Sequence, residues 1–139
     1  MTQLNGQASL TGSDFARSMI GVPWANRACS WQVCDCWGLV VLYYRHVAGV
    51  EIHHSSGYEA ASDFVTCFSE AVVFWQPVPV PQEGGIFIGY DGNQQAHVGL
   101  IIDGRALHSR GENGGVRSDR LSAVEKVFTK LEYMIYAGN

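Results

Sequence analysis

The feature that most constrains this fold is an Asp-Cys pair directly before an apolar run, in the stretch Val33 to Val47, VCDCWGLVVLYYRHV. If the run forms a helix from Cys36, its apolar residues recur at helical spacings and share one broad face. These residues are Leu39, Val40, Tyr43, Tyr44 and Val47. Asp35 then falls at the N-cap, and Gly49 ends the helix. The sequence therefore predicts an amphipathic helix that begins at a cysteine.

A thiol in the first turn of a helix lies beside unsatisfied backbone N–H groups and the positive end of the helix dipole. Both favour the thiolate over the thiol. Cys36 is therefore a candidate nucleophile with a lowered pKa. The alternative is that Cys36 is a small buried hydrophobic residue, as most single cysteines are.

The rest of the chain changes from helical to extended periodicity. A short helix capped by Ser13 or Thr11 carries Phe15, Met19 and Ile20. Further helices are expected at Tyr58 to Phe68 and near Ser122 to Val127, and a possible edge strand at Val72 to Trp75. Prolines 77, 79 and 81 are expected to exclude regular structure after it. Strands are expected at Gly85 to Tyr90, Ala96 to Ile102, Arg105 to His108 and Leu131 to Tyr136, with Asp-Gly turns after the first two.

Helices that precede strands are typical of an α+β domain in which a helix packs on an antiparallel sheet. With 139 residues, 47% of them hydrophobic, the chain is long enough for one core. We expect residues 1–12 to form a flexible arm and residues 13–139 to form the domain.

Two of the five histidines are candidates for a base that serves Cys36. His97 and His108 lie on the two runs that flank the Asp103-Gly104 turn, so a hairpin brings them to the same open end. His46 lies roughly 15 Å along the helix from Cys36, and His53 and His54 lie in a polar connection. The pattern predicts a Cys, His, His triad.

These motifs resemble the NlpC/P60 cysteine peptidases, in the strings DCWGLVVLYYRHVAGVEI, AHVGLIID and ALHS. The resemblance implies a papain-like α+β fold, with Cys36 as nucleophile, His97 as general base and acid, and His108 as the group that orients His97. It implies hydrolysis of amide bonds in peptidoglycan stem peptides without a cofactor. We expect Trp24, Asp35 and Trp37 to contact the substrate. Pro23-Trp24 replaces the common Pro-Tyr, and Glu83-Gly84-Gly85 replaces Pro-Gly-Asp, so the bond that is cut stays open.

The phrase CDCWGLV is most similar to the subgroup found in bacteriophage and gene-transfer-agent tails. The N-terminus shows no secretory signal pattern. We therefore expect a tail-tip component with tail or hub proteins as partners, assembled in the host cytoplasm and acting in the periplasm and cell wall. Two alternatives stay open: a structural tail subunit or plug with dispensable activity, and a wall-degrading effector injected by bacteria.

Other classes are disfavoured by composition. The net charge is −4 and no basic stripe occurs, which argues against nucleic acid as a partner. No apolar run approaches the roughly 18 residues of a membrane span. A zinc site from Cys29, Cys34, Cys36 and His54 has poor ligand spacing, and Cys67 is expected in the core, so no metal site is predicted.

Overall fold

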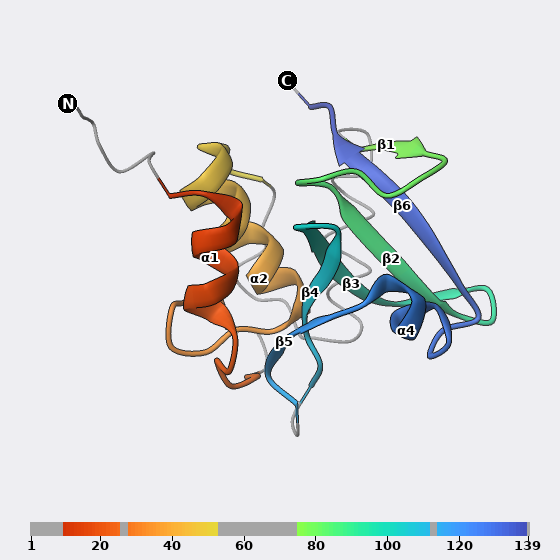
Figure 1. Ribbon diagram of the computed structural model, residues 1–139, viewed down its shortest axis with the longest axis horizontal. Coiled ribbons are helices and arrows are strands. Elements are labelled where there is room, and N and C mark those ends of the chain that lie inside the picture. Colours follow the sequence, from red (N-terminus) through yellow and green to blue (C-terminus); the bar gives the residue numbers. More distant parts are fainter. Residues whose placement is uncertain (1–9, 26–27, 53–74, 112–113, 139) are drawn as a thin grey trace.

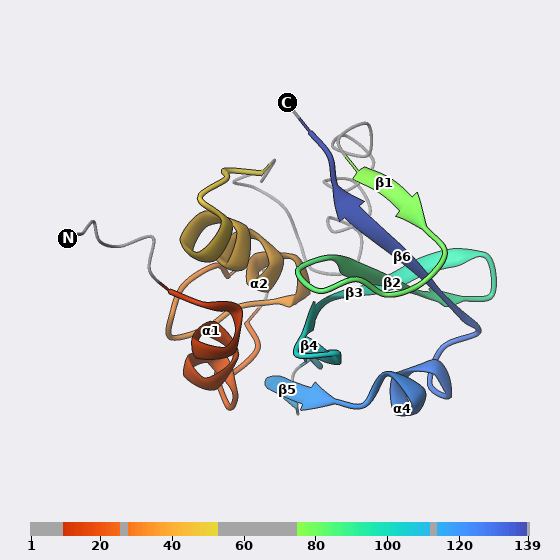
Figure 2. The same cartoon turned by 45° about the horizontal axis from the view of Figure 1, so that its top comes forward.

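The computed structural model describes residues 10–25, 28–52, 75–111 and 114–138. Within the described ranges, the helices are α1 (Gly12–Met19), α2 (Cys36–Tyr43) with its extension η2 (Tyr44–Ala48), and α4 (Leu121–Glu125). Helices α1 and α2 lie together on one side of an antiparallel sheet (Figure 1, Figure 2), and the short helix α4 packs on the opposite face through Val124. The predicted α+β architecture is confirmed.

In the described part of the chain, six strands form the sheet, in the spatial order β1-β6-β2-β3-β4-β5. They are β1 (Trp75–Val78), β2 (Ile86–Asp91), β3 (Gln94–Ile102), β4 (Arg105–Ser109), β5 (Val116–Asp119) and β6 (Lys130–Tyr136). Helix α2 packs against β3 and β4, at the centre of the sheet. The two candidate histidines lie on β3 and β4, as predicted, so the fold brings them next to the cysteine helix.

Helix α1 is capped by Thr11, one of the two residues predicted for this role. The side chain of Thr11 accepts a hydrogen bond from the backbone N–H of Asp14 at 3.0 Å. Phe15 and Met19 are fully buried, whereas Ile20 is 52% exposed and lies just past the helix. The predicted arm falls mainly on residues 1–9, which lie outside the described residues, and its boundary at residue 12 stays a prediction.

Helix α2 is apolar on every side rather than amphipathic. All eight of its residues are buried, because α1, the preceding loop and the sheet enclose it. The prediction of one apolar face was therefore wrong about this helix, although the predicted face is buried from Leu39 to Tyr44. The helix widens into a π-helical turn and ends at Gly49, whose φ of 71° is in the left-handed region.

The hairpin that carries both candidate histidines has the expected tight turn. Asp103 and Gly104 have φ values of 56° and 72°, as a two-residue type I′ turn requires. Ile102 pairs with Arg105, and Leu100 pairs with Leu107. Chemistry local to this turn therefore sets the register of β3 against β4.

Two strands differ from the sequence predictions. Pro77 lies within β1, so the expectation that the prolines exclude regular structure was wrong there; the strand tolerates proline because β1 is at the edge of the sheet. Strand β5 was not predicted at all. The helix predicted at Tyr58 to Phe68, and most of the strand predicted at Val72 to Trp75, lie outside the described residues.

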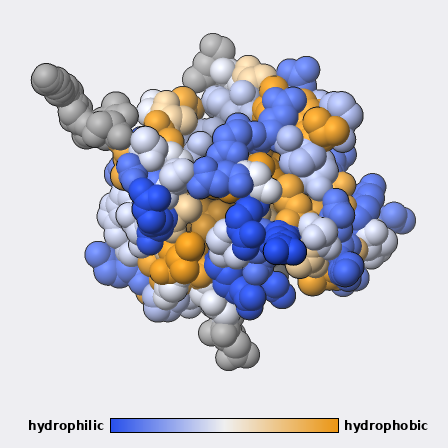
Figure 3. All heavy atoms as spheres, viewed as in Figure 1, coloured by the Kyte–Doolittle hydropathy of each residue, from blue (hydrophilic) through white to orange (hydrophobic). Residues whose placement is uncertain are grey.

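The sheet has an apolar core on each face. The larger core lies between the sheet and helices α1 and α2. The smaller one contains Phe87, Ile101, Ala106 and Val124, with Phe128 packed against it. On the face of the molecule shown in Figure 3, viewed as in Figure 1, small apolar patches lie between hydrophilic side chains. Among the described residues, every helix is too short or too polar to cross a membrane.

Candidate active site

Cys36 is held at the start of α2 by the residues around it. Asp35 caps the helix, since its Oδ1 accepts a hydrogen bond from the N–H of Gly38 at 2.7 Å. The N–H of Asp35 donates in turn to the carbonyl of Ala28 at 3.1 Å. Gly38 allows this approach, because a Cβ at that position would lie 2.0 Å from the Ala28 carbonyl oxygen. The predicted N-cap is confirmed, and the glycine of the motif has a packing reason.

Two of the three residues expected to contact the substrate are in the core. Asp35 and Trp37 each have 0% exposure. Asp35 acts on the helix terminus, and the ring of Trp37 packs edge-on against Trp75 with centroids 6.4 Å apart. Their assignment as substrate-binding residues is therefore corrected, because neither presents surface to a ligand.

His97 on β3 and His108 on β4 lie side by side, as the hairpin predicted. Nε2 of His97 lies 2.9 Å from Nδ1 of His108. The ring of Phe128 stacks on His97, with centroids 5.6 Å apart and an interplanar angle of 12°. Gly99 leaves space for this arrangement, since a Cβ there would lie 2.8 Å from the Cβ of His108. The two imidazoles are thus fixed by packing as well as by a hydrogen bond.

Asp119 on β5 is a member of this cluster that the sequence analysis missed. Its Oδ2 lies 2.8 Å from Nε2 of His108, and its Oδ1 lies 3.1 Å from Nη2 of Arg117. Nη1 of Arg110 is 3.9 Å from the same carboxylate. The available signal was the glycine-rich turn at residues 111–115, which could have suggested a second hairpin after His108.

Cys36 and His97 line one pocket of about 200 Å³. It is also lined by Trp24, Ala96, Ser109, Arg110 and Gly111. Of the predicted substrate-binding residues, only Trp24 lies here, and it is half-buried. The hydroxyl of Ser109 donates to the carbonyl of Cys34 at 3.2 Å, which ties β4 to the segment before Cys36. The pocket therefore combines a thiol, an imidazole, an indole and a guanidinium.

Burial keeps the thiol and the imidazole uncharged in the free protein. Burial, and then the nearby charge of Asp35, raise the pKa of Cys36 to about 12, although backbone N–H groups of Val98, Trp37 and Cys36 itself act in the opposite direction. Burial, followed by His108 and Arg110, lowers the pKa of His97 to about 3. The expected low pKa of Cys36 was therefore wrong, because desolvation outweighs the helix terminus. A neutral imidazole can still accept the thiol proton during attack.

The other described thiols, Cys29 and Cys34, are not disulfide-bonded. Sγ of Cys29 donates to the carbonyl of Gly38 at 3.5 Å, and Cys34 is fully buried. Within the described part of the chain, no group of three or more His, Cys, Asp or Glu residues is placed to hold a metal ion. His54 and Cys67, which belonged to the zinc alternative, lie outside it.

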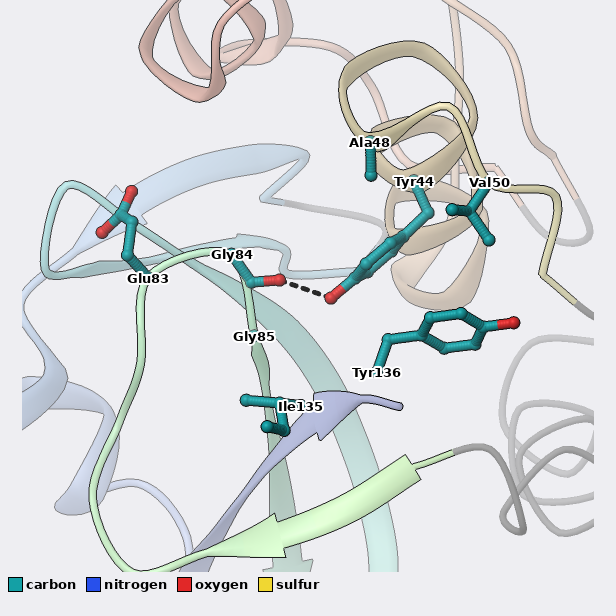
Figure 4. Close-up of a pocket in the computed structure, with 8 residues that line it drawn as sticks. All are labelled: Tyr44, Ala48, Val50, Glu83, Gly84, Gly85, Ile135 and Tyr136. Atoms are coloured by element: carbon teal, nitrogen blue, oxygen red, sulfur yellow. Dashed lines mark hydrogen bonds between the residues drawn. The ribbon is translucent and has the colours of Figure 1, made fainter. Parts of the chain in front are cut away.

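A larger pocket of about 280 Å³ lies near the opposite end of α2 (Figure 4). Tyr44 and Tyr136 line it, and the hydroxyl of Tyr44 donates to the carbonyl of Gly84. The carboxylate of Glu83 points away from these rings and accepts hydrogen bonds from the N–H groups of Asp103 and Gly104. Its described lining residues include no thiol or imidazole, whereas the smaller pocket has both, so the smaller pocket is the candidate active site.

Solved structures share this fold at low sequence identity. The NlpC/p60 domain of the peptidoglycan hydrolase SagA matches with a TM-score of 0.62 and 14% identity, over 94% of this chain and 98% of that domain. NlpC2 from Trichomonas vaginalis matches with a TM-score of 0.68 and 13% identity, over 96% of this chain and 50% of that one. An NLP/P60 family protein similar to lipoprotein, from Staphylococcus aureus, matches with a TM-score of 0.62 and 19% identity, over 99% and 44%.

The chain thus spans about half or less of the length of the Trichomonas and Staphylococcus proteins. A comparison with curated proteins gave no match. The family model described as NlpC/P60 matches residues 21–134, which include the cysteine helix, both histidine strands and Asp119. With that match over most of its length, the chain belongs to the NlpC/P60 family, whose members are generally cell-wall hydrolases.

Proposed function

We propose that this protein is a cysteine peptidase that hydrolyses amide bonds in peptidoglycan stem peptides. Cys36 is the nucleophile, His97 is the general base and acid, and His108 orients His97. The observation that carries the proposal is that Cys36 and His97 line one pocket while His97 is hydrogen-bonded to His108. Membership of the NlpC/P60 family supports peptidoglycan as the substrate.

The reaction would begin when Sγ of Cys36 attacks the amide carbonyl and His97 takes the thiol proton. The tetrahedral intermediate collapses when the C–N bond breaks and His97 gives its proton to the leaving amine. Water then attacks the acyl-enzyme, again with His97 as base, and releases the carboxylic acid and the thiol. Both starting groups are uncharged, so the step needs no preformed thiolate and imidazolium pair.

The first turn of α2 offers N–H groups to the oxyanion that forms. Such groups lack partners within the helix, and the dipole favours negative charge there. The N–H groups of Cys36 and Trp37 already lie close enough to Sγ to favour its thiolate form. One such donor is typically worth about 3 kcal/mol of barrier.

We further propose that the protein is a component of a phage tail tip, assembled in the host cytoplasm, that opens the wall of the infected cell. The support is the resemblance of CDCWGLV to tail-borne relatives. Trp37 is buried and packs against Trp75, so its side chain gives no separate support for a tail location. This part of the proposal therefore rests on the sequence resemblance.

Digestion of purified peptidoglycan tests the activity. Wild-type protein should release stem-peptide fragments that mass spectrometry identifies, and Cys36→Ala should release none while its circular dichroism is unchanged. His97→Ala should match Cys36→Ala, and His108→Gln should retain partial activity. Failure of the wild type on sacculi of several chemotypes would contradict the peptidase proposal and favour a structural subunit. Detection of the protein in purified virions, together with tail proteins, would separate a tail component from an injected effector.

A further inference from the structure

We propose that Asp119 is a positioning residue that fixes the protons of both imidazoles, so that Nδ1 of His97 carries the free lone pair. This inference rests on the proposed function, which makes His97 the base. Three side chains on adjacent strands form a continuous line: His97 Nε2 to His108 Nδ1 at 2.9 Å, and His108 Nε2 to Asp119 Oδ2 at 2.8 Å. Asp119 is the terminal group of that line.

The carboxylate of Asp119 is ionised and can only accept hydrogen bonds. Although burial raises its pKa, the hydrogen bond from His108 and the charge of Arg117 outweigh burial and hold the pKa below its usual range. The guanidinium of Arg117 also fixes the other oxygen at 3.1 Å. Nε2 of His108 must therefore carry a proton in order to make its 2.8 Å contact.

The position of the proton on His108 determines that on His97. Burial lowers the pKa of His108, so the ring is neutral at pH 7 and its Nδ1 is unprotonated. That atom can only accept, and Nε2 of His97 must donate to it. His97 is itself neutral, which leaves its Nδ1 without a proton.

The two imidazoles alone would not make this choice. In the reversed arrangement, His108 would donate from Nδ1 to Nε2 of His97, with the same number of hydrogen bonds between the rings. His97 would then carry a proton on Nδ1 and could not serve as a base through that atom. Asp119 is the acceptor that disfavours the reversed arrangement, because it would face a bare Nε2 on His108. Among the described residues, the arginines that pair with this carboxylate are Arg110 and Arg117, and neither guanidinium can accept a proton, so Asp119 makes the choice.

The tautomers can be read directly in the wild-type protein. Long-range proton–nitrogen correlation spectra of 15N-histidine-labelled protein at pH 7 distinguish a proton on Nδ1 from one on Nε2. We expect Nε2–H on both His97 and His108. In Asp119→Asn, the amide can donate as well as accept, so a population with the proton on Nδ1 of His97 should emerge. Asp119→Glu keeps an ionised acceptor and should preserve the wild-type tautomers.

The rate of Cys36 alkylation by iodoacetamide gives a second readout that needs no peptidoglycan. Asp119→Asn should slow it roughly a hundredfold or more, because general-base catalysis is typically worth about 10²–10⁴-fold and His97 with its proton on Nδ1 cannot take the thiol proton through that atom. Asp119→Glu should restore most of the rate. Asp91→Asn is the matched control, since Asp91 is exposed at the end of β2, and it should leave the rate unchanged.

A wild-type spectrum with the proton on Nδ1 of His97 would overturn the inference, even if every variant failed to fold. Unchanged tautomers and an unchanged alkylation rate in Asp119→Asn would also overturn it. If the tautomers follow expectation but the wild type cuts no peptidoglycan, the proposed function fails and the role of Asp119 in setting the protons stands.

Discussion

Replacing Gly38 by alanine tests whether close packing against the first turn of α2 holds Cys36 in place. An ideal Cβ at residue 38 would lie 2.0 Å from the carbonyl oxygen of Ala28 and 3.1 Å from Oδ1 of Asp35. Real Cβ atoms essentially never come within 3.0 Å of a heavy atom of this kind. Because the contact is with backbone, the preceding loop and the helix must separate by about 1 Å.

One stabilising and two destabilising contributions set the change in the free energy of unfolding. Alanine favours a helix over glycine by about 1 kcal/mol. Overpacking costs about 1–3 kcal/mol, and weakening of the Asp35 cap costs about 1 kcal/mol. We therefore expect Gly38→Ala to lower the free energy of unfolding by about 1–3 kcal/mol. For a chain of this size, that corresponds to a fall in Tm of roughly 3–12 °C.

Urea denaturation followed by circular dichroism measures this free energy. Gly12→Ala in α1 is the matched control, because the nearest described atoms to a Cβ at that position belong to the side chains of Ile102 and Tyr43, at 3.6 Å or more, which is ordinary van der Waals contact. The control should unfold within about 0.5 kcal/mol of the wild type, or slightly later. If Gly38→Ala has the same urea midpoint as the wild type, the reasoning about the Ala28 contact is refuted.

Three further predictions concern the site itself. Gly99→Ala places a Cβ 2.4 Å from the ring of Phe87 and 2.8 Å from the Cβ of His108. It should separate His108 from His97 and lower peptidoglycan cleavage about a hundredfold, as a misplacement of about 1 Å in an active site can, and full activity in that variant would contradict the packing argument. Acidification from pH 6.5 toward about 3 should destabilise the protein, since His97 takes up a proton in this range when unfolded but not when folded. Urea midpoints measured across this range should fall less steeply with pH in His97→Gln than in the wild type. Equal slopes in the two proteins would argue against a neutral buried imidazole. Arg110→Gln should raise KM roughly tenfold to a hundredfold for stem peptides that carry a carboxylate, since a hydrogen bond to a charged group is worth about 1.5–3 kcal/mol. Steady-state kinetics in which kcat falls and KM does not would exclude a binding role.

Local chemistry made several features of the fold predictable. Asp35 caps α2 through an atom three residues away in sequence, and Asp103-Gly104 adopts the turn that these residue types favour. The hairpin turn then fixed His97 next to His108 from sequence spacing alone. Strand β5 was not predicted, because it has only four residues and a single apolar one, Val116, so it shows no alternating pattern.

The sequence by itself determined where the cysteine helix begins, where the hairpin turns and which two histidines meet, because each depends on residues close together in the chain. Only the tertiary structure decided that Asp119 reaches His108, since β4 and β5 must pair before the two side chains meet. It also decided that Trp37 is a core residue and that Cys36 has a raised pKa. Burial depends on segments distant in sequence, and in this site desolvation is larger than the local effect of the helix terminus.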